Sequence, residues 1–223
     1  YVEYVSWLAN VATSCEKILQ EVRNLQRSEL SEAGEGFDVK KQVGSSTMAH
    51  KKNPIKSENA SGLARIVRSF IIPTYENALL WHERDLANSS SERFTLSHGS
   101  ALCEDVIAKT RQVLTNMWVD AERCMENIRA QRGLVMAEKV MIDLVERGIP
   151  RDEAHEILRE ASFTAVANKE ELIDVCSRTP AISAAFSAEE LEAMFEPSNH
   201  IGVSGEIVDE AVALARAAIQ TTE

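Results

Sequence analysis

The sequence predicts an all-α protein in which a bundle of long helices is followed by a smaller all-helical domain. Apolar residues recur at three- and four-residue steps over long stretches, which is the period of an amphipathic helix. No stretch shows the convincing two-residue alternation of a strand. After residue 120 the periodic stretches become shorter and are separated by Gly and Pro. We therefore expect two domains, residues 1–120 and 121–223.

The first predicted helix covers residues 2 to about 29, because neither Gly nor Pro interrupts this stretch. At 1.5 Å per residue it would be roughly 40 Å long, which suits a bundle better than a compact globule. Its apolar residues at helical spacing are Val5, Leu8, Val11, Ala12, Cys15, Ile18, Leu19, Val22 and Leu25.

Two further long helices are expected in the first domain. One begins at Pro54, whose fixed φ suits a helix start, and Pro73 should kink it. Its apolar face is predicted to comprise Leu63, Ile66, Val67, Phe70, Ile71 and Ala78. The other follows a polar stretch, residues 81–94, and carries the apolar residues Leu102, Val106, Ile107, Val113, Leu114 and Met117.

The second domain contains clear helix boundaries. Gly148 should end one helix and Pro150 should open the next. Ser187 and Glu190 have the spacing of a capping box. A last helix is expected over residues 207–219.

The composition limits the function classes. A formal net charge of −11 argues against a nucleic-acid binder, which needs a basic face. No segment has the apolar length of a membrane span, and no signal peptide is visible. The four cysteines, Cys15, Cys103, Cys124 and Cys176, show no C-x-x-C spacing, so we expect buried free thiols in a reducing compartment. We therefore expect a cytoplasmic protein. The apolar stripes on the long helices are too wide for one chain to bury, which predicts a homo-oligomer.

Residues 44–54, Gly-Ser-Ser-Thr-Met-Ala-His-Lys-Lys-Asn-Pro, differ from the helices on either side. Hydroxyl, ammonium, imidazole and carboxamide groups are concentrated here without any apolar periodicity. This pattern is typical of a loop that carries chemistry on a rigid scaffold, and we expect such a loop over residues 34–54. The charges between Glu29 and Val43 are expected to be solvated.

The same segment resembles the serine loop of the fumarase/aspartase superfamily, which reads G-S-S-x-M-P-x-K-x-N-P. Ala49 stands where the family has proline, which predicts a more flexible loop. Residues 75–77, 81–85 and 89–93 resemble the adenylosuccinate lyase branch of that superfamily. The resemblance runs from about Trp7 through the second domain, and it implies the long-helix bundle of this superfamily.

The resemblance implies elimination of fumarate from a succinyl-nucleotide of purine biosynthesis, adenylosuccinate or the related succinyl-carboxamide ribotide. By position in the motif, Ser45 is the general base, and Lys51 could stabilise its alkoxide. Ser46, Lys51 and Asn53 would bind the substrate carboxylate as its charge grows. Glu58 matches the position that orients the catalytic histidine.

Arg84, Ser89 and Arg93 match family positions that bind the phosphate and ribose end of the nucleotide, and arginine forks suit phosphate. Each residue also has a structural interpretation. Ser45 could be a helix cap, and Glu58 could only complement the helix dipole. The two arginines could be salt-bridge partners at a bundle interface. We interpret His50 as a solvated loop residue.

The family's catalytic acid, a histidine in a Thr-x-x-His-Gly-type segment, has no counterpart in this sequence. We therefore expect that the chain is N-terminally truncated, and that it contributes to sites that the family builds from three subunits of a tetramer. Argininosuccinate lyase, a carboxymuconate cycloisomerase and a non-catalytic helical oligomerisation fragment remain alternatives. No metal or organic cofactor is expected, because the other histidines lack metal-ligand spacing; these are His82, His98, His155 and His200.

Overall fold

The computed structural model describes residues 1–36 and 52–220, and these residues are mostly helical, as the sequence predicts. The chain forms two compact units, Tyr1–Met125 and Glu126–Glu223, each with its own core. The division at residue 120, with a catalytic first domain, stays a prediction. Each unit is described separately below.

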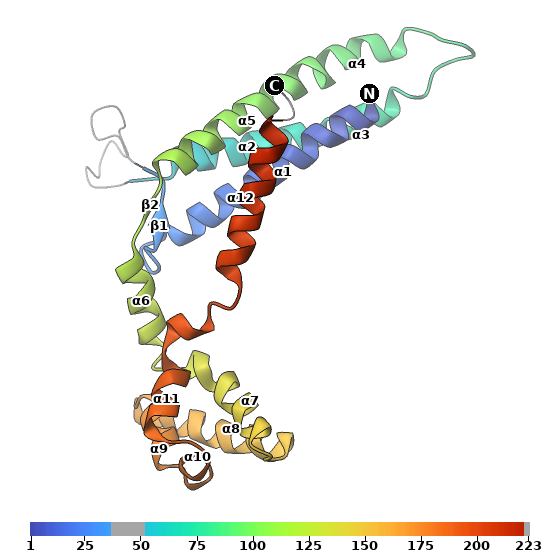
Figure 1. Cartoon of the computed structure of the whole chain (residues 1–223). Coiled ribbons are helices and arrows are strands. Elements are labelled where there is room, and N and C mark those ends of the chain that lie inside the picture. The colour runs from blue at the N-terminus through green and yellow to red at the C-terminus, as the bar shows by residue number, and fades with distance from the viewer. Residues whose placement is uncertain (37–51, 221–223) are drawn as a thin grey trace. The chain divides into compact units, whose positions relative to one another are not determined.

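Three long helices form the body of the first unit: α1 (Val2–Leu25), α2 (Ile55–Ser69) and α5 (Ser97–Asn116) (Figure 1). They lie side by side and share two apolar clusters. The buried members are Leu8, Ala12, Ala64, Val67 and Cys103 in one cluster, and Leu19, Val22, Ala60 and Val113 in the other.

The buried face of α2 differs from the expected one. It consists mostly of small residues, namely Ser57, Ala60, Ser61, Ala64 and Val67. Ile66, which we expected on this face, is 47% exposed. Small side chains allow the α2 backbone to approach α1 and α5 closely, so the larger apolar residues are displaced to the flanks of the helix.

Pro73 breaks the second long helix instead of merely kinking it. Helix α2 ends at Ser69, and the short helix α3 (Ile71–Glu76) follows. Pro73 has no N–H to donate to the Ser69 carbonyl, and its ring crowds that carbonyl. Helix α4 (Ala87–Thr95) then covers part of the polar stretch 81–94, so Ser89 and Arg93 lie on a helix.

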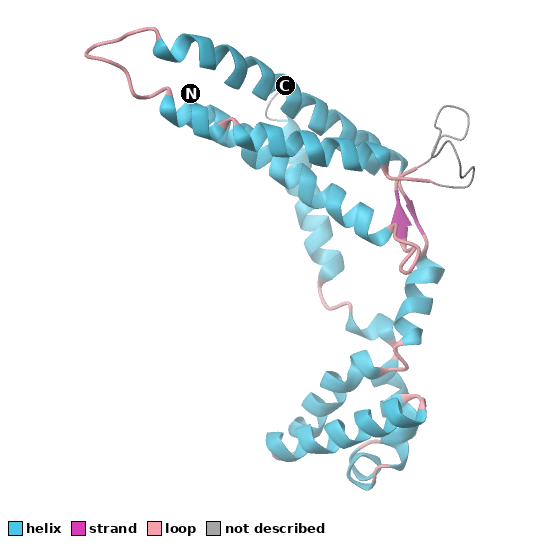
Figure 2. Cartoon of the chain, turned by 180° about the vertical axis from the view of Figure 1, so that it is seen from behind, coloured by secondary structure: helices cyan, strands magenta, loops and turns pink. Residues whose placement is uncertain are grey.

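One pair of very short strands accompanies the helices of this all-α fold. Strands β1 (Ala33–Gly34) and β2 (Trp118–Val119) pair in antiparallel fashion beside the end of the bundle where α2 begins (Figure 2). The Asp120 N–H extends the pairing by donating to the Glu32 carbonyl at 2.8 Å. Two residues per strand are too few for sequence alternation to reveal.

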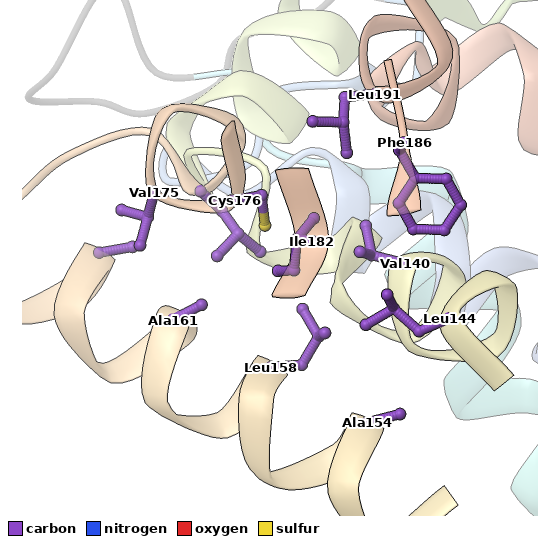
Figure 3. Packing of buried hydrophobic residues seen from close by; sticks show 12 residues of the cluster. Val140, Leu144, Ala154, Leu158, Ala161, Val175, Cys176, Ile182, Phe186 and Leu191 are labelled. Atoms are coloured by element: carbon purple, nitrogen blue, oxygen red, sulfur yellow. The ribbon is translucent and has the colours of Figure 1, made fainter. Parts of the chain in front are cut away.

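The second unit begins within α6 (Ala121–Ala130) and is also helical. Its remaining elements are η1 (Leu134–Met136), α7 (Ala137–Glu146), α8 (Arg151–Asn168), α9 (Leu172–Arg178), α10 (Pro180–Ala185), α11 (Ala188–Phe195), η2 (Pro197–His200) and α12 (Ser204–Gln220). Side chains of α7, α8, α9, α10 and α11 meet in one core, in which Ile182 faces Leu158, Val140 and Leu144 (Figure 3).

The predicted helix boundaries at Gly148, Pro150 and Ser187 are confirmed, whereas the last helix, α12, begins three residues earlier than expected, at Ser204. Helix α7 ends at Glu146, and Gly148 has a φ of +92°, which glycine tolerates best. Pro150 directly precedes α8. Ser187 and Glu190 form the capping box: the Glu190 N–H donates to Ser187 Oγ at 3.2 Å, and the Ser187 N–H donates to Glu190 Oε2 at 2.8 Å. The Ser187 N–H, and secondarily Arg147, hold the pKa of Glu190 below its ordinary value.

We expect Ser187→Ala to lower the free energy of unfolding by about 1 kcal/mol, because one N–H at the start of α11 loses its acceptor. Urea unfolding at pH 7, followed by circular dichroism, measures this. Ser183→Ala is the control, since its exposed hydroxyl only bonds back to helix carbonyls. Equal effects of both substitutions would contradict the capping role.

Helix α12 has no buried residue in the described part of the chain, although several of its residues are large and apolar. These are Ile207, Val208, Val212, Leu214 and Ile219. No helix among the described residues is long and apolar enough to cross a membrane.

The cysteines are all free thiols, as expected, but only Cys103 and Cys176 are buried. Burial raises the pKa of Cys103 and raises that of Cys176 to about 11. The thiolate is the reactive form, so we expect Cys176 to resist alkylation by iodoacetamide at pH 8 until the chain unfolds. Peptide mass mapping, with and without urea, measures this, and rapid native labelling of Cys176 would show that its site opens readily.

Candidate active site

A polar pocket of about 760 Å³ lies in the first unit, where α1 ends and α2 begins. Both helix ends and the segment leading into α2 contribute to its wall. The lining residues are Gln20, Arg23, Asn24, Gln26, Arg27, Ser28, Lys52, Asn53, Pro54 and Glu58.

The charged groups of this pocket favour an anionic ligand. Among the described lining residues, three are cationic, Arg23, Arg27 and Lys52, and one is a carboxylate, Glu58. Arg23 Nη1 donates to Gln20 Oε1 at 3.0 Å, and Arg27 Nε donates to the Asn24 carbonyl at 3.2 Å. These bonds orient the guanidinium groups without neutralising them. A locally positive pocket can thus exist on a chain whose net charge is −11.

Two of the residues predicted from the motif, Asn53 and Glu58, line this pocket together. The backbone brings them close: the Ile55 N–H donates to the Asn53 carbonyl and the Glu58 N–H donates to the Pro54 carbonyl, both at 2.9 Å. Glu58 lies in the first turn of α2 and is exposed, so its carboxylate is available to a ligand or a neighbouring group.

Ser45, Ser46 and Lys51 lie outside the described residues, as does His50. Their assignment therefore rests on the motif. Among the residues that the structure does describe, no group of three or more His, Cys, Asp or Glu side chains could hold a metal ion.

Glu35 corrects our expectation that the charges between Glu29 and Val43 are solvated. Its side chain is buried, at 4% exposure. Glu35 Oε1 accepts from the Lys56 N–H at 3.1 Å, and Oε2 accepts from both the N–H and the Oγ of Ser57 at 3.0 Å. The carboxylate therefore caps α2, where unpaired N–H groups and the helix dipole favour a negative charge.

Arg84, Ser89 and Arg93 do not reach this pocket. They belong to the α3–α4 connection and to α4, at the other end of the bundle from the start of α2 (Figure 1). The rise of 1.5 Å per residue places Glu58 and Glu76 roughly 25 Å apart along α2 and α3. The two groups of predicted site residues are therefore separated within one chain.

The two arginines form no salt bridge within the described part of the chain. Both side chains are exposed. Between them, Asp85 accepts from the N–H groups of Trp81 and Ala87 at 2.9 and 2.8 Å. These bonds lower the pKa of Asp85 and fix the start of α4. Arg84 and Arg93 thus remain available to a ligand or to another chain.

The sequence reasoning missed Arg23, Arg27, Gln26 and Glu35. Arg23 and Arg27 are four residues apart at the end of a helix that leads to the serine segment, a spacing that indicates a shared face. Glu35 stands between two glycines, Gly34 and Gly36, which indicates a close backbone approach. Neither pattern alone specifies a pocket.

The comparisons with known proteins agree with this description. A family model described as Adenylosuccinate lyase C-terminus matches residues 133–211, and one described as Lyase matches residues 1–69. An adenylosuccinate lyase from Archaeoglobus fulgidus is 43% identical over 95% of this chain, which covers 48% of that protein. One from Methanothermobacter thermautotrophicus is 41% identical over 94% of this chain, which covers 46% of that protein. The chain spans about half the length of these curated relatives.

Solved structures show the same fold. A 3-carboxy-cis,cis-muconate lactonizing enzyme from Pseudomonas putida superposes with a TM-score of 0.83 at 30% identity, over 95% of this chain and 46% of that one. A fumarate lyase from Mesorhizobium sp. BNC1 gives 0.83 at 26% identity, with the same shares covered. The fold is thus the long-helix bundle of the fumarase/aspartase superfamily lyases. Within that superfamily, the chain belongs to the adenylosuccinate lyase family, as the sequence indicated.

Proposed function

We propose that the protein containing this chain eliminates fumarate from adenylosuccinate and from the related succinyl-carboxamide ribotide. A base removes a proton from the carbon next to a carboxylate, the C–N bond breaks, and the leaving nitrogen takes a proton. The intermediate carries an additional negative charge on that carboxylate, which the site must stabilise.

The motif gives each residue a role in this reaction. Ser45 is the base, and Lys51 stabilises its alkoxide. Ser46, Lys51 and Asn53 bind the carboxylate whose charge grows. Glu58 orients the general acid, for which we assign no residue of this chain. No metal or organic cofactor is required by this scheme.

The observation that carries the proposal is the positive pocket that Asn53 and Glu58 line directly after the serine segment. Its volume of about 760 Å³ suits a small anionic metabolite. The sequence relatives favour the succinyl-nucleotide over the muconate substrate. Adenylosuccinate lyases reach 43% identity, whereas the muconate lactonizing enzyme from Pseudomonas putida reaches 30%.

We further propose that the protein acts as a cytoplasmic homotetramer whose subunits share active sites. Arg84, Ser89 and Arg93 would then bind the nucleotide phosphate and ribose in a site whose serine segment comes from another copy. Two observations support this proposal: the separation of these residues from Glu58, and the exposed apolar side chains on the long helices. Examples of the latter are Trp7, Ile18, Ile66, Ile107 and Leu114.

The test is an assay of the full-length protein with adenylosuccinate, argininosuccinate and 3-carboxy-cis,cis-muconate in parallel. We expect fumarate release from adenylosuccinate at least about 10³-fold faster than turnover of the others, because a site built to bind substrate polar groups rejects analogues that lack them. Turnover of only argininosuccinate or the muconate would replace the proposal with that activity. Turnover of none would favour a non-catalytic helical module.

A further inference from the structure

We propose that Glu35 and Gln26 are positioning residues that lock the Lys52–Glu58 segment, and hence Asn53 and Glu58, into place for the reaction. This inference rests on the proposed function, and it gives a role to the buried Glu35 carboxylate, which has no role in the proposed elimination reaction. Neither side chain is proposed to touch the substrate.

Gln26, the residue that follows α1, joins two segments that are far apart in the sequence. Its Oε1 accepts from the Glu35 N–H at 2.9 Å, and its Nε2 donates to the Lys52 carbonyl at 3.0 Å. One carboxamide therefore ties the residues on either side of the segment 37–51 to the end of α1. Lys52 is directly followed by Asn53, so this bond fixes the approach to the pocket.

Glu35 completes the connection by capping α2 through the Lys56 and Ser57 N–H groups, as described above. Glu58 is the next residue along the helix. Both anchored backbone positions thus adjoin a residue of the candidate site, Lys52 beside Asn53 and Ser57 beside Glu58. A shift of either anchor moves a site residue directly.

The segment that presents Glu35 is itself held firmly. Gly34 pairs with Trp118 across the two strands, and a Cβ at Gly34 would lie 2.7 Å from the Trp118 ring. A Cβ at Gly36 would collide with the Asn116 carbonyl. The absence of side chains on both sides of Glu35 lets this backbone press against the end of α5. The backbone that carries the Glu35 carboxylate is therefore rigid, as a positioning group requires.

The test is Glu35→Gln in the full-length protein, assayed with adenylosuccinate. Gln replaces one acceptor oxygen with an NH₂ group, which must face an N–H donor of α2. A misplacement of about 1 Å costs about 10²-fold in rate, so we expect kcat to fall about 10²-fold. KM should change by less than about threefold, because the displaced groups act mainly on the transition state. Hydrogen exchange at the Lys56 and Ser57 N–H groups should accelerate.

Three matched variants sharpen the test. Glu35→Asp keeps two acceptor oxygens on a shorter stem and should recover part of kcat. Ser57→Ala removes only the hydroxyl bond and should stay within a few-fold of wild type. Glu29→Gln makes the same charge change at an exposed position and should have no effect.

Two results would overturn the inference: a Glu35→Gln variant with kcat within about threefold of wild type, or a loss of activity that only follows the unfolded fraction. Failure of the proposed function gives a different result, since the wild-type protein itself would then release no fumarate from adenylosuccinate. That measurement on the wild-type protein would overturn the inference as well, without any variant.

Discussion

Replacing Ser45 with alanine is expected to lower kcat for adenylosuccinate by about 10²–10⁴-fold, the usual contribution of a positioned general base. The Ser45 oxygen takes the proton from carbon only in the transition state, so removing it should leave KM nearly unchanged. Steady-state fumarate release by the full-length protein measures both parameters. The melting temperature should stay constant if the hydroxyl has no structural role.

Thr47→Ala is the matched control, because it removes a hydroxyl from the same segment at a position to which the motif assigns no role. This variant should retain activity within a few-fold of wild type. Retention of wild-type kcat by Ser45→Ala would remove Ser45 from the mechanism, and equal losses in both variants would indicate a general effect on the segment.

Much of the fold could be predicted because long helices repeat their pattern many times. The stripe from Val5 to Leu25 includes several turns of α1, and a single deviating residue does not hide the period. Helix ends that depend on particular residue types could also be predicted, as at Gly148 and in the Ser187 capping box. The sequence also led to Asn53 and Glu58, because their spacing from the serine pair belongs to a specific motif.

The remaining features depend on contacts between segments distant in the sequence. The buried side of α2 consists mostly of serine and alanine, which hydropathy ranks below Ile66, yet small residues allow the closest packing at this place. Glu35 looked like one charge among many in a polar stretch. Its burial depends on α2 presenting unpaired N–H groups from 21 and 22 residues further along the chain. No local pattern encodes such a partner.

These contacts also hold the backbone in place on both sides of residues 37–51. The side chains of Gln26 and Glu35 form hydrogen bonds with backbone groups on both sides of residues 37–51, and Gln26 also lines the pocket. The pocket can thus be lined by polar side chains while its backbone remains fixed.

In the second unit, Leu144→Ala is expected to lower the free energy of unfolding by about 2.7–5 kcal/mol, the range found for leucine truncation in well-packed cores. Leu144 is fully buried in α7 and belongs to the cluster formed with Val140, Leu158 and Ile182 (Figure 3). Removing its isobutyl group leaves a cavity that the fixed helices around it can fill only in part. Urea unfolding followed by circular dichroism measures the change.

Ile142→Ala on the same helix provides the control, since Ile142 is 42% exposed and alanine favours a helix. Its effect should stay within about 0.5 kcal/mol. All three tryptophans, Trp7, Trp81 and Trp118, lie in the first unit, so their fluorescence follows that unit separately. Because each unit has its own core, the part of the circular-dichroism transition that comes from the second unit should move while the fluorescence transition stays in place. A shift below about 1 kcal/mol for Leu144→Ala would mean that this core relaxes far more readily than its packing indicates.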